Sequence, residues 1–339
     1  MTLSVAIAGC GYFSRFHQDA WSRMDGVRVV GVADRDGDKR AAAVALFPQA
    51  QAFDDAEVML DAVRPDLIDI VTPPQTHLAL VRAAVGRGVK VICQKPLAPD
   101  QSEAEEVVAA AEQAGVMLAV HENFRFMPWF MEARRLIDAG AVGRPLNVTF
   151  RLRPGDGKGP DAYLARQPYF QTMPRFLIHE VGIHLIDTFR YLCGEIVGVF
   201  GRLRRINPVI KGEDSALVIF DFANGAAGVF DGNRLVDHPA TDTRMTNGVL
   251  LVEGDEGVVR LDGYGRLFLR TPAGEEREHP YAWENRGFGG DCVYNQSKHV
   301  VDHLTRKLLL VNSGRDYLRN IVIEEAVYRS AAEGRYIPL

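Results

Sequence analysis

The sequence lacks a long hydrophobic run, a basic block and closely spaced cysteines, and each absence argues against a class of protein. No apolar stretch approaches the roughly 18 residues of a membrane span, so we expect no membrane partner. The formal net charge is −5 and the cationic side chains are dispersed, which disfavours nucleic-acid binding. The cysteines lack metal-ligand spacing and predict free thiols in a reducing cytoplasm, without a bound metal; they are Cys10, Cys93, Cys193 and Cys292.

The chain is long enough for more than one hydrophobic core. It has 339 residues, 47% apolar and 24% charged, which is the balance of an ordinary globular protein. The N-terminus shows no basic flank or cleavage site, and residues 3–8 already have the character of a strand, so we expect no signal peptide. The length predicts two domains.

The stretch from Val5 to Asp34 has the order of a dinucleotide-binding βαβ unit. A short apolar run, 5–8, reads as a buried parallel strand, and a second run, 27–33, ends in Asp34. Between them, Gly9 permits a tight turn and Gly11 lets a pyrophosphate approach the backbone. The helix that follows would direct free N–H groups at the phosphates. The alternative reading is that the glycines only turn a strand into a helix.

Asp34 and its neighbour bear on the choice of cofactor. Asp34 follows Gly9 by 25 residues and is placed to accept hydrogen bonds from the adenosine ribose. Arg35 could hold a 2′-phosphate, but Asp34 would repel one, so we favour NAD and keep NADP as the alternative. Ser14 replaces the third glycine of the motif and is still small enough for close packing of helix on strand.

Strand and helix alternate through the first 120 residues, which predicts a doubly wound parallel sheet of the Rossmann type. Asp100 or Ser102 is expected to cap the last helix of this region and Gly115 to end it. The expected strands, after the first two, are 66–71, 89–93 and 116–120, and the expected helices are 38–47, 55–63, 76–86 and 100–114.

The second part of the chain is mostly strand-like. Asn224-Gly225 and Asp262-Gly263 are hairpin signals. We expect strands at 146–153, 196–205, 216–222, 226–235, 243–252, 257–261 and 266–269, and helices at 128–139, 176–192, 291–310 and 315–333. The sequence therefore predicts a Rossmann domain, 1–122, and a C-terminal α+β domain, 123–339, with a mostly antiparallel open sheet plus helices.

Polar segments follow three of the expected parallel strands, where doubly wound sheets bind their ligands. They are Thr72-Pro73-Pro74-Gln75-Thr76-His77, Gln94-Lys95-Pro96 and His121-Glu122-Asn123-Phe124-Arg125. Lys95 lies between a buried strand and a proline, where it could hydrogen-bond a substrate hydroxyl or carry a proton. The alternative for Lys95 is a lysine on a surface turn.

A second group of polar residues lies on the helix expected from residue 176. Glu180, His184 and Asp187 have i, i+4, i+7 spacing and would share one face, so a carboxylate could orient the imidazole of a general base. Solvated or capping roles are the alternative, and a zinc site that includes His179 lacks a clear third-ligand spacing. In the preceding loop, Tyr163, Gln167 and Tyr169 could line a substrate pocket or could simply pack the loop, and both readings stay open.

Together these motifs resemble the glucose–fructose oxidoreductase / inositol dehydrogenase / MocA family over the whole chain. The matching segments are the GCG turn, TPPQTH at 72–77, QKP at 94–96, NFRF at 123–126, EVGIH at 180–184 and the C-terminal SGRDYLRN…EEAVYRSAAEGR. The resemblance implies an NAD(P)-dependent sugar or polyol dehydrogenase.

The resemblance also implies roles for single residues. Lys95 matches the lysine that polarises the reacting hydroxyl, His184 the histidine of the acid–base pair, and Glu180 its carboxylate partner. The implied cofactor contacts are Gly9, Gly11, Tyr12, Phe13, Asp34, Arg35, Thr72, Pro73, His77, Gln94, Lys95 and Asn123. The resemblance implies substrate contacts by Lys95, Arg125 and His184, and the residues of the preceding loop add Tyr163, Gln167 and Tyr169.

Two positions depart from the family pattern: Gln94 replaces the usual glutamate, and Glu180 replaces the usual aspartate. Within the family, VICQKPLAP, VHENFRF and SGRDYLR look most like D-apiose dehydrogenases, which implies oxidation of D-apiose or a related aldose to its lactone. The alternatives are a non-enzymatic dinucleotide sensor and an NAD-assisted glycosidase. An open sheet with one uncovered face, together with the resemblance, predicts a homodimer or homotetramer built through the C-terminal sheet.

Overall fold

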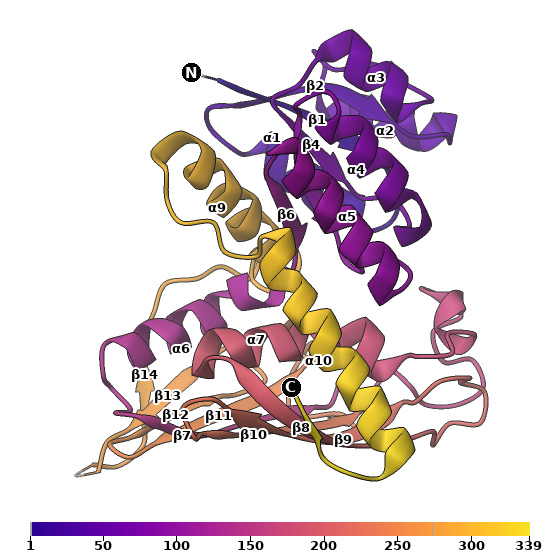
Figure 1. The fold of residues 1–339 in the computed structure, drawn as a ribbon. Coiled ribbons are helices and arrows are strands. Elements are labelled where there is room, and N and C mark those ends of the chain that lie inside the picture. The colour runs from indigo at the N-terminus through magenta and orange to yellow at the C-terminus, as the bar shows by residue number, and fades with distance from the viewer. Residues whose placement is uncertain (1, 273) are drawn as a thin grey trace. The chain divides into compact units, whose positions relative to one another are not determined.

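The computed structural model describes residues 2–272 and 274–339, which form two compact units (Figure 1). The first unit contains residues up to 123 together with 291–319, and the second contains 124–290 together with 320–339. The predicted domains, 1–122 and 123–339, remain a prediction; the compact units differ from them in that residues 291–319 group with the first. No helix among the described residues is both long and apolar enough to cross a membrane.

The first unit is built on a six-stranded parallel sheet of order β3-β2-β1-β4-β5-β6, which confirms the predicted Rossmann sheet. Its strands are β1 (Leu3–Ala8), β2 (Val27–Ala33), β3 (Gln51–Phe53), β4 (Leu67–Ile70), β5 (Lys90–Gln94) and β6 (Leu118–His121). The short β3 was not expected from the sequence.

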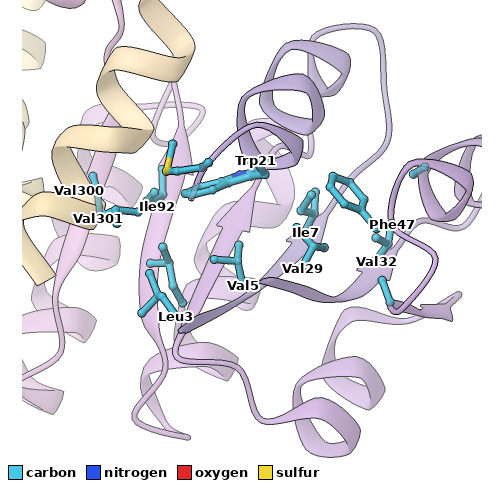
Figure 2. Close-up of a cluster of buried hydrophobic side chains, with 14 of the residues drawn as sticks. Leu3, Val5, Ile7, Trp21, Val29, Val32, Phe47, Ile92, Val300 and Val301 are labelled. Atoms are coloured by element: carbon cyan, nitrogen blue, oxygen red, sulfur yellow. The ribbon is translucent and has the colours of Figure 1, made fainter. Parts of the chain in front are cut away.

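Two groups of helices accompany this sheet. One contains α1 (Ser14–Ser22), which packs on α2 (Gly37–Leu46) and α9 (Cys292–Arg306); the other contains α3 (Ala56–Val63), α4 (His77–Val85) and α5 (Gln101–Ala114), in contact with one another in that order, and η1 (Pro74–Thr76) precedes α4. Figure 2 shows the apolar core between strands and helices, in which Trp21, Ile7 and Val300 come from separate elements. The burial of these side chains is the reason that the strands have continuous hydrophobic sequences.

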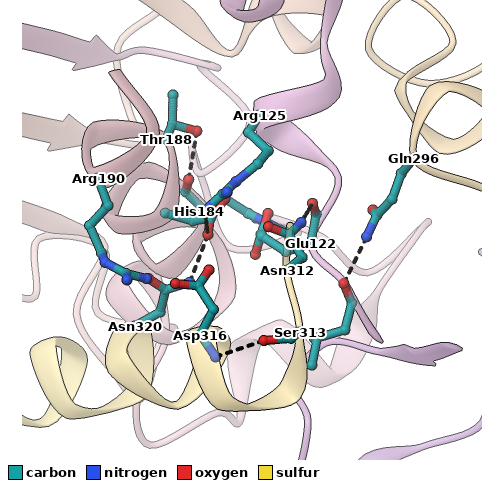
Figure 3. Close-up of polar contacts among 12 residues, drawn as sticks. Glu122, Arg125, His184, Thr188, Arg190, Gln296, Asn312, Ser313, Asp316 and Asn320 are labelled. Carbon is teal, nitrogen blue, oxygen red and sulfur yellow. Dashed lines mark hydrogen bonds and ion pairs between the residues drawn. The ribbon is translucent and has the colours of Figure 1, made fainter. Parts of the chain in front are cut away.

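The segment 291–319 joins the first unit beside β6. Ser313 forms an antiparallel bridge with Ala119, and the Asn312 carbonyl accepts a hydrogen bond from the Val120 N–H at 2.9 Å. The Gln296 side chain donates to the Val120 carbonyl at 2.7 Å (Figure 3). These bonds satisfy backbone groups along the free edge of β6.

The second unit contains a nine-stranded sheet of order β14-β13-β12-β11-β7-β10-β9-β8-β15. All neighbouring pairs are antiparallel except β7 and β10, so the predicted mostly antiparallel sheet is confirmed. Its strands are β7 (Pro145–Leu152), β8 (Ile196–Arg204), β9 (Ser215–Phe222), β10 (Ala227–Asn233), β11 (Gly248–Gly254), β12 (Val258–Leu261), β13 (Leu267–Arg270), β14 (Arg277–His279) and β15 (Ile337–Pro338).

Burial alternates along the strands of this sheet, because helices cover only one face. Figure 1 shows α6 and α7 on that side of the strands. The helical elements of the unit are η2 (Phe124–Phe126), α6 (Pro128–Asp138), η3 (Pro168–Gln171), the π-helical turn η4 (Ile178–Gly182), α7 (Ile183–Cys193), α8 (Thr243–Thr246) and the greater part of α10 (Gly314–Glu333).

Two expected elements differ from the structure. The strand expected at 243–252 was wrong at its start, because Asp242 caps the short helix α8 by accepting from the Arg244 N–H, and the strand begins only at Gly248. The helix expected at 176–192 starts with the π-helical turn instead of a regular turn. Neither feature changes the hydrophobic pattern from which the elements were predicted.

Candidate active site

The turn between β1 and α1 has the geometry that a dinucleotide needs. Gly9 has φ +97°, and a Cβ there would lie 2.7 Å from the Val71 carbonyl oxygen, so only glycine fits. A Cβ on Gly11 would meet nothing within 4 Å, which leaves the backbone of that residue open to a ligand. Phe13, at the N-cap of α1, makes no side-chain cap, and the Ser14 and Phe16 N–H groups donate at 3.1 Å to the carbonyls of Gly11 and Phe13.

Asp34 is held at the end of β2 by backbone donors. Its Oδ2 accepts from the Cys10 N–H at 2.6 Å and its Oδ1 from the Asp36 N–H at 2.8 Å. Each carboxylate oxygen has a second lone pair, so Asp34 can still accept from ribose hydroxyls. Arg35 is exposed. The Asp34 carboxylate and the turn therefore fit NAD, whose nicotinamide is the hydride acceptor when bound.

Tyr12 and Phe13, two other predicted cofactor contacts, follow this turn. Tyr12 is exposed, and the Arg15 guanidinium lies over it, 4.3 Å from the ring centroid. Phe13 packs on Phe16 with ring centroids 5.3 Å apart. The cofactor contacts of Tyr12 and Phe13 remain predictions.

The segment after β4 is fixed by His77. This buried imidazole lies 2.9 Å from the Thr72 carbonyl oxygen through Nε2 and 3.0 Å from the Leu97 carbonyl oxygen through Nδ1. Burial lowers the pKa of His77, although the two carbonyl acceptors oppose this shift. Thr72 and Pro73 lie on the loop that His77 ties down, and their cofactor contacts remain predictions.

Gln94 and Lys95 follow at the end of β5. Gln94 is buried, and its Oε1 accepts from the Lys95 N–H at 2.7 Å, while Lys95 itself is half-buried. At the end of β6, Asn123 is buried and its Oδ1 has no hydrogen-bond partner among the described residues. A buried acceptor of this kind is suited to a ligand donor. The first unit thus brings most predicted cofactor residues to the carboxyl edge of its sheet.

In the second unit, His184 lies at the start of α7. The Phe124 ring stacks on its imidazole with centroids 4.0 Å apart and planes 2° from parallel. The Thr188 hydroxyl donates to the His184 carbonyl at 2.8 Å (Figure 3). Stacking and burial fix the plane of the imidazole, as an acid–base group requires.

Glu180 lies in the π-helical turn, and its carboxylate accepts from Arg234 Nη1 at 3.0 Å. Arg234 is buried and also donates to both Asp156 oxygens, at 2.8 and 3.2 Å. Burial by itself would lower the pKa of Arg234, but the carboxylates of Asp156 and Glu180 outweigh it and hold that pKa above its ordinary value.

Asp187, expected on the face of Glu180 and His184, forms a buried bidentate ion pair with Arg125, at 2.5 and 2.6 Å. Asn320 donates to the same carboxylate at 2.8 Å. Arg125 was predicted to contact substrate and this remains a prediction, but its guanidinium has Asp187 as a partner.

The predicted pocket residues of the 154–175 loop fall into two environments. Tyr163 is buried against Phe170 and Phe176, and burial raises the pKa of its phenol. Gln167 donates to the Tyr169 hydroxyl at 2.9 Å, and Tyr169 is exposed. Substrate contacts by these three residues remain predictions.

Sequence reasoning missed Arg234, Asp156 and the Phe124 ring over His184. Arg234 follows strand β10 without any motif around it, and its role depends on Asp156, which lies 78 residues away in the sequence. Phe124 was placed in a polar motif but not against His184. The only available signal was a lone arginine after a strand of alternating apolar residues.

Known proteins resemble this chain over its full length. The family model described as "Oxidoreductase family, NAD-binding Rossmann fold" matches residues 3–122, and the GFO/IDH/MocA C-terminal domain matches residues 130–260. The D-apiose dehydrogenase of Paraburkholderia graminis is 35% identical over 98% of this chain and 89% of the relative. That of Rhizobium rhizogenes is 31% identical over 99% and 97%.

A solved structure is similarly close. An oxidoreductase from Agrobacterium radiobacter, in complex with NAD+, L-tartaric acid and magnesium, is 30% identical. It superposes with a TM-score of 0.90 and covers 100% of this chain and 98% of its own.

Proposed function

This chain belongs to the GFO/IDH/MocA family and is an NAD-binding oxidoreductase, and we propose that it oxidises D-apiose or a closely related aldose to the lactone. The main support for this proposal is that the two D-apiose dehydrogenases match nearly the whole chain, including both segments that bear Lys95 and His184. Oxidation of a cyclic aldose at its hemiacetal carbon removes a hydride from carbon and a proton from the hydroxyl, and leaves the lactone.

The chain's own residues then have separate tasks. Lys95 donates a hydrogen bond to the reacting hydroxyl and favours loss of its proton, and His184 accepts that proton. The Phe124 ring and burial hold the His184 imidazole in one plane, which supports its assignment as the base. Arg234 holds the Glu180 carboxylate in place.

The test is reduced-nicotinamide absorbance with purified protein, NAD or NADP, and a panel of apiose, pentoses, hexoses and inositols. We expect a rise with apiose or a related aldose and a preference for NAD, because Asp34 disfavours a 2′-phosphate. Lys95→Ala should lower kcat by about two orders of magnitude. Lys90→Ala is the matched control, because Lys90 lies at the other end of β5 and should leave turnover unchanged.

A flat response across the panel with NAD still bound would reject the dehydrogenase assignment. It would favour the sensor, or a glycosidase in which reduced cofactor does not accumulate. Near-normal turnover by Lys95→Ala would reject only the catalytic role assigned to Lys95.

We also propose that the protein forms a homodimer or homotetramer through the second sheet. On its uncovered face, Phe200, Ile219 and Val229 pair directly across β8, β9 and β10, and the row continues through Thr149 of β7 to Leu251 of β11. Phe200 and Ile219 are 37% and 42% exposed in the single chain, which supports burial of this row against a second copy. The four free, buried thiols support the proposed cytoplasmic location.

A further inference from the structure

A buried chain of hydrogen bonds leads from β4 to the backbone of Lys95. Asp69 of β4 lies 2.8 Å from His17 Nδ1 of α1, and His17 Nε2 lies 3.1 Å from the Gln94 amide nitrogen. Gln94 Oε1 then accepts from the Lys95 N–H at 2.7 Å. Asp69 and His17 are fully buried and Gln94 is nearly so, so water does not compete with these bonds.

The donor and acceptor groups at the two ends fix the position of every proton in this hydrogen-bond network. The Lys95 N–H can only donate, so the Gln94 atom that faces it must be the amide oxygen. The Gln94 amide nitrogen therefore faces His17 and donates, which requires an unprotonated Nε2. The single ring proton of His17 must then sit on Nδ1, where it is donated to Asp69.

The assignment also shows what a glutamine provides at position 94 that a glutamate would not. A glutamate could accept from the Lys95 N–H but could not donate to a neutral His17. His17 would then need a second proton to bond with carboxylates on both sides. Gln94 and neutral His17 therefore satisfy each other without a further buried charge.

We propose that Asp69, His17 and Gln94 are positioning residues that hold Lys95 for its reaction, with His17 neutral and protonated on Nδ1. The inference rests on the proposed function, because Lys95 is there assigned to the reacting hydroxyl. The network fixes the backbone from which the Lys95 side chain starts, and the His121 ring, 4.1 Å from the His17 ring between centroids, packs against that imidazole. Small displacements of a reacting group lower turnover strongly.

The first test is ¹⁵N NMR of the whole protein labelled at histidine, with the His17 signals identified by their loss in His17→Asn. We expect a protonated Nδ1 and a non-protonated Nε2 in the unsubstituted protein, and protonation of both nitrogens in Gln94→Glu. A proton on Nε2 in the unsubstituted protein, or an unchanged spectrum in Gln94→Glu, overturns the proposal. This measurement needs no substrate, so its failure is distinct from a failure of the proposed function.

The second test measures kcat and KM on the aldose that the panel identifies. His17→Asn can still donate to Asp69 but is too short to reach Gln94, and Gln94→Leu removes both bonds of that side chain. We expect each to lower kcat about tenfold or more, and we expect His17→Asn, which lies outside the predicted cofactor contacts, to change KM for NAD by less than roughly twofold. Gln94→Glu should retain more activity than Gln94→Leu, because its carboxylate still accepts from the Lys95 N–H.

Trp21→Phe is the matched control. The Trp21 indole donates to the same Asp69 oxygen at 2.6 Å but lies outside the path to Lys95. This variant should melt at a lower temperature and keep kcat within roughly twofold of the unsubstituted enzyme. If His17→Asn lowers kcat no more than Trp21→Phe does, or if Gln94→Leu and Gln94→Glu are equally active, the network does not position Lys95.

Discussion

Arg234 is a buried cation whose carboxylate partners come from distant parts of the second unit. Asp156 and Glu180 neutralise it, and the rings of Tyr163, Phe170 and Phe176 surround it at 4.8 to 5.5 Å from their centroids. A buried guanidinium with this environment joins the 154–175 loop to the turn that carries Glu180.

Replacing Arg234 by lysine should destabilise the protein by about 2 kcal/mol, because a buried ammonium cannot bridge both half-buried carboxylates and loses a charge-assisted hydrogen bond. Chemical denaturation measures the loss. Arg166→Lys is the matched control, since Arg166 bonds the same Asp156 oxygen at 3.1 Å from a partly exposed position and should cost less than about 1 kcal/mol. Equal losses in the two variants would contradict the importance of the buried pair.

His77 makes stability depend on pH. Burial lowers its folded-state pKa below the ordinary value of 6.5, so below that value the unfolded chain binds a proton that the folded chain does not. Stability should therefore fall as the pH drops below about 6.5, by at most about 1.4 kcal/mol per pH unit from this group. Urea unfolding of the unsubstituted protein and of His77→Gln measures it; an identical pH slope in both would show that His77 is not the source.

At the scale of elements, helix ends follow the local sequence closely. Asp100 accepts from the Glu103 N–H at 2.9 Å and so caps α5, and Gly115 ends the helix with φ +64°. The sequence left Asp100 and Ser102 open as the cap, and the structure selects Asp100. The π-helical turn before α7 is the opposite case, since nothing in its local sequence distinguishes it from a regular turn.

Asp100→Ala should lower the free energy of unfolding by about 1 kcal/mol, because an N–H at the start of α5 loses its acceptor. Turnover should stay unchanged. Ser102→Ala is the control and should have little effect on stability, since Ser102 is exposed and lies inside the helix. A thermal melt that shifts equally in both variants would contradict Asp100 as the cap.

At the scale of the whole molecule, the second sheet has one face under helices and the other uncovered. The uncovered row through Phe200 and Ile219 is the molecular basis of the proposed assembly. We expect Ile219→Lys to shift the molar mass at micromolar concentration toward a monomer, because it places a charge in the proposed interface. Light scattering measures the mass.

Leu309→Lys is the control for this change. Leu309 is 84% exposed and belongs to the first unit, so its replacement leaves the second sheet intact and should not change the mass. A monomeric unsubstituted protein at the same concentration would reject assembly through the sheet altogether.

The sequence by itself determined the order and type of most elements and the location of the dinucleotide turn. Buried strands and amphipathic helices carry their periodicity locally, and Gly9, Gly11 and Asp34 have roles set by backbone conformation and short spacing. It could not give the short edge strands β3, β14 and β15, whose two or three residues carry too little pattern.

Only the tertiary structure decided which polar groups meet. The parallel contact of β7 with β10, the pairing of Asp187 with Arg125, and the placement of Arg234 beside Glu180 each join residues far apart in the sequence. The same holds for the bonds from Asp69 through His17 to Gln94, which fix a proton on one ring nitrogen. Such contacts depend on how complete elements pack, so no local pattern records them.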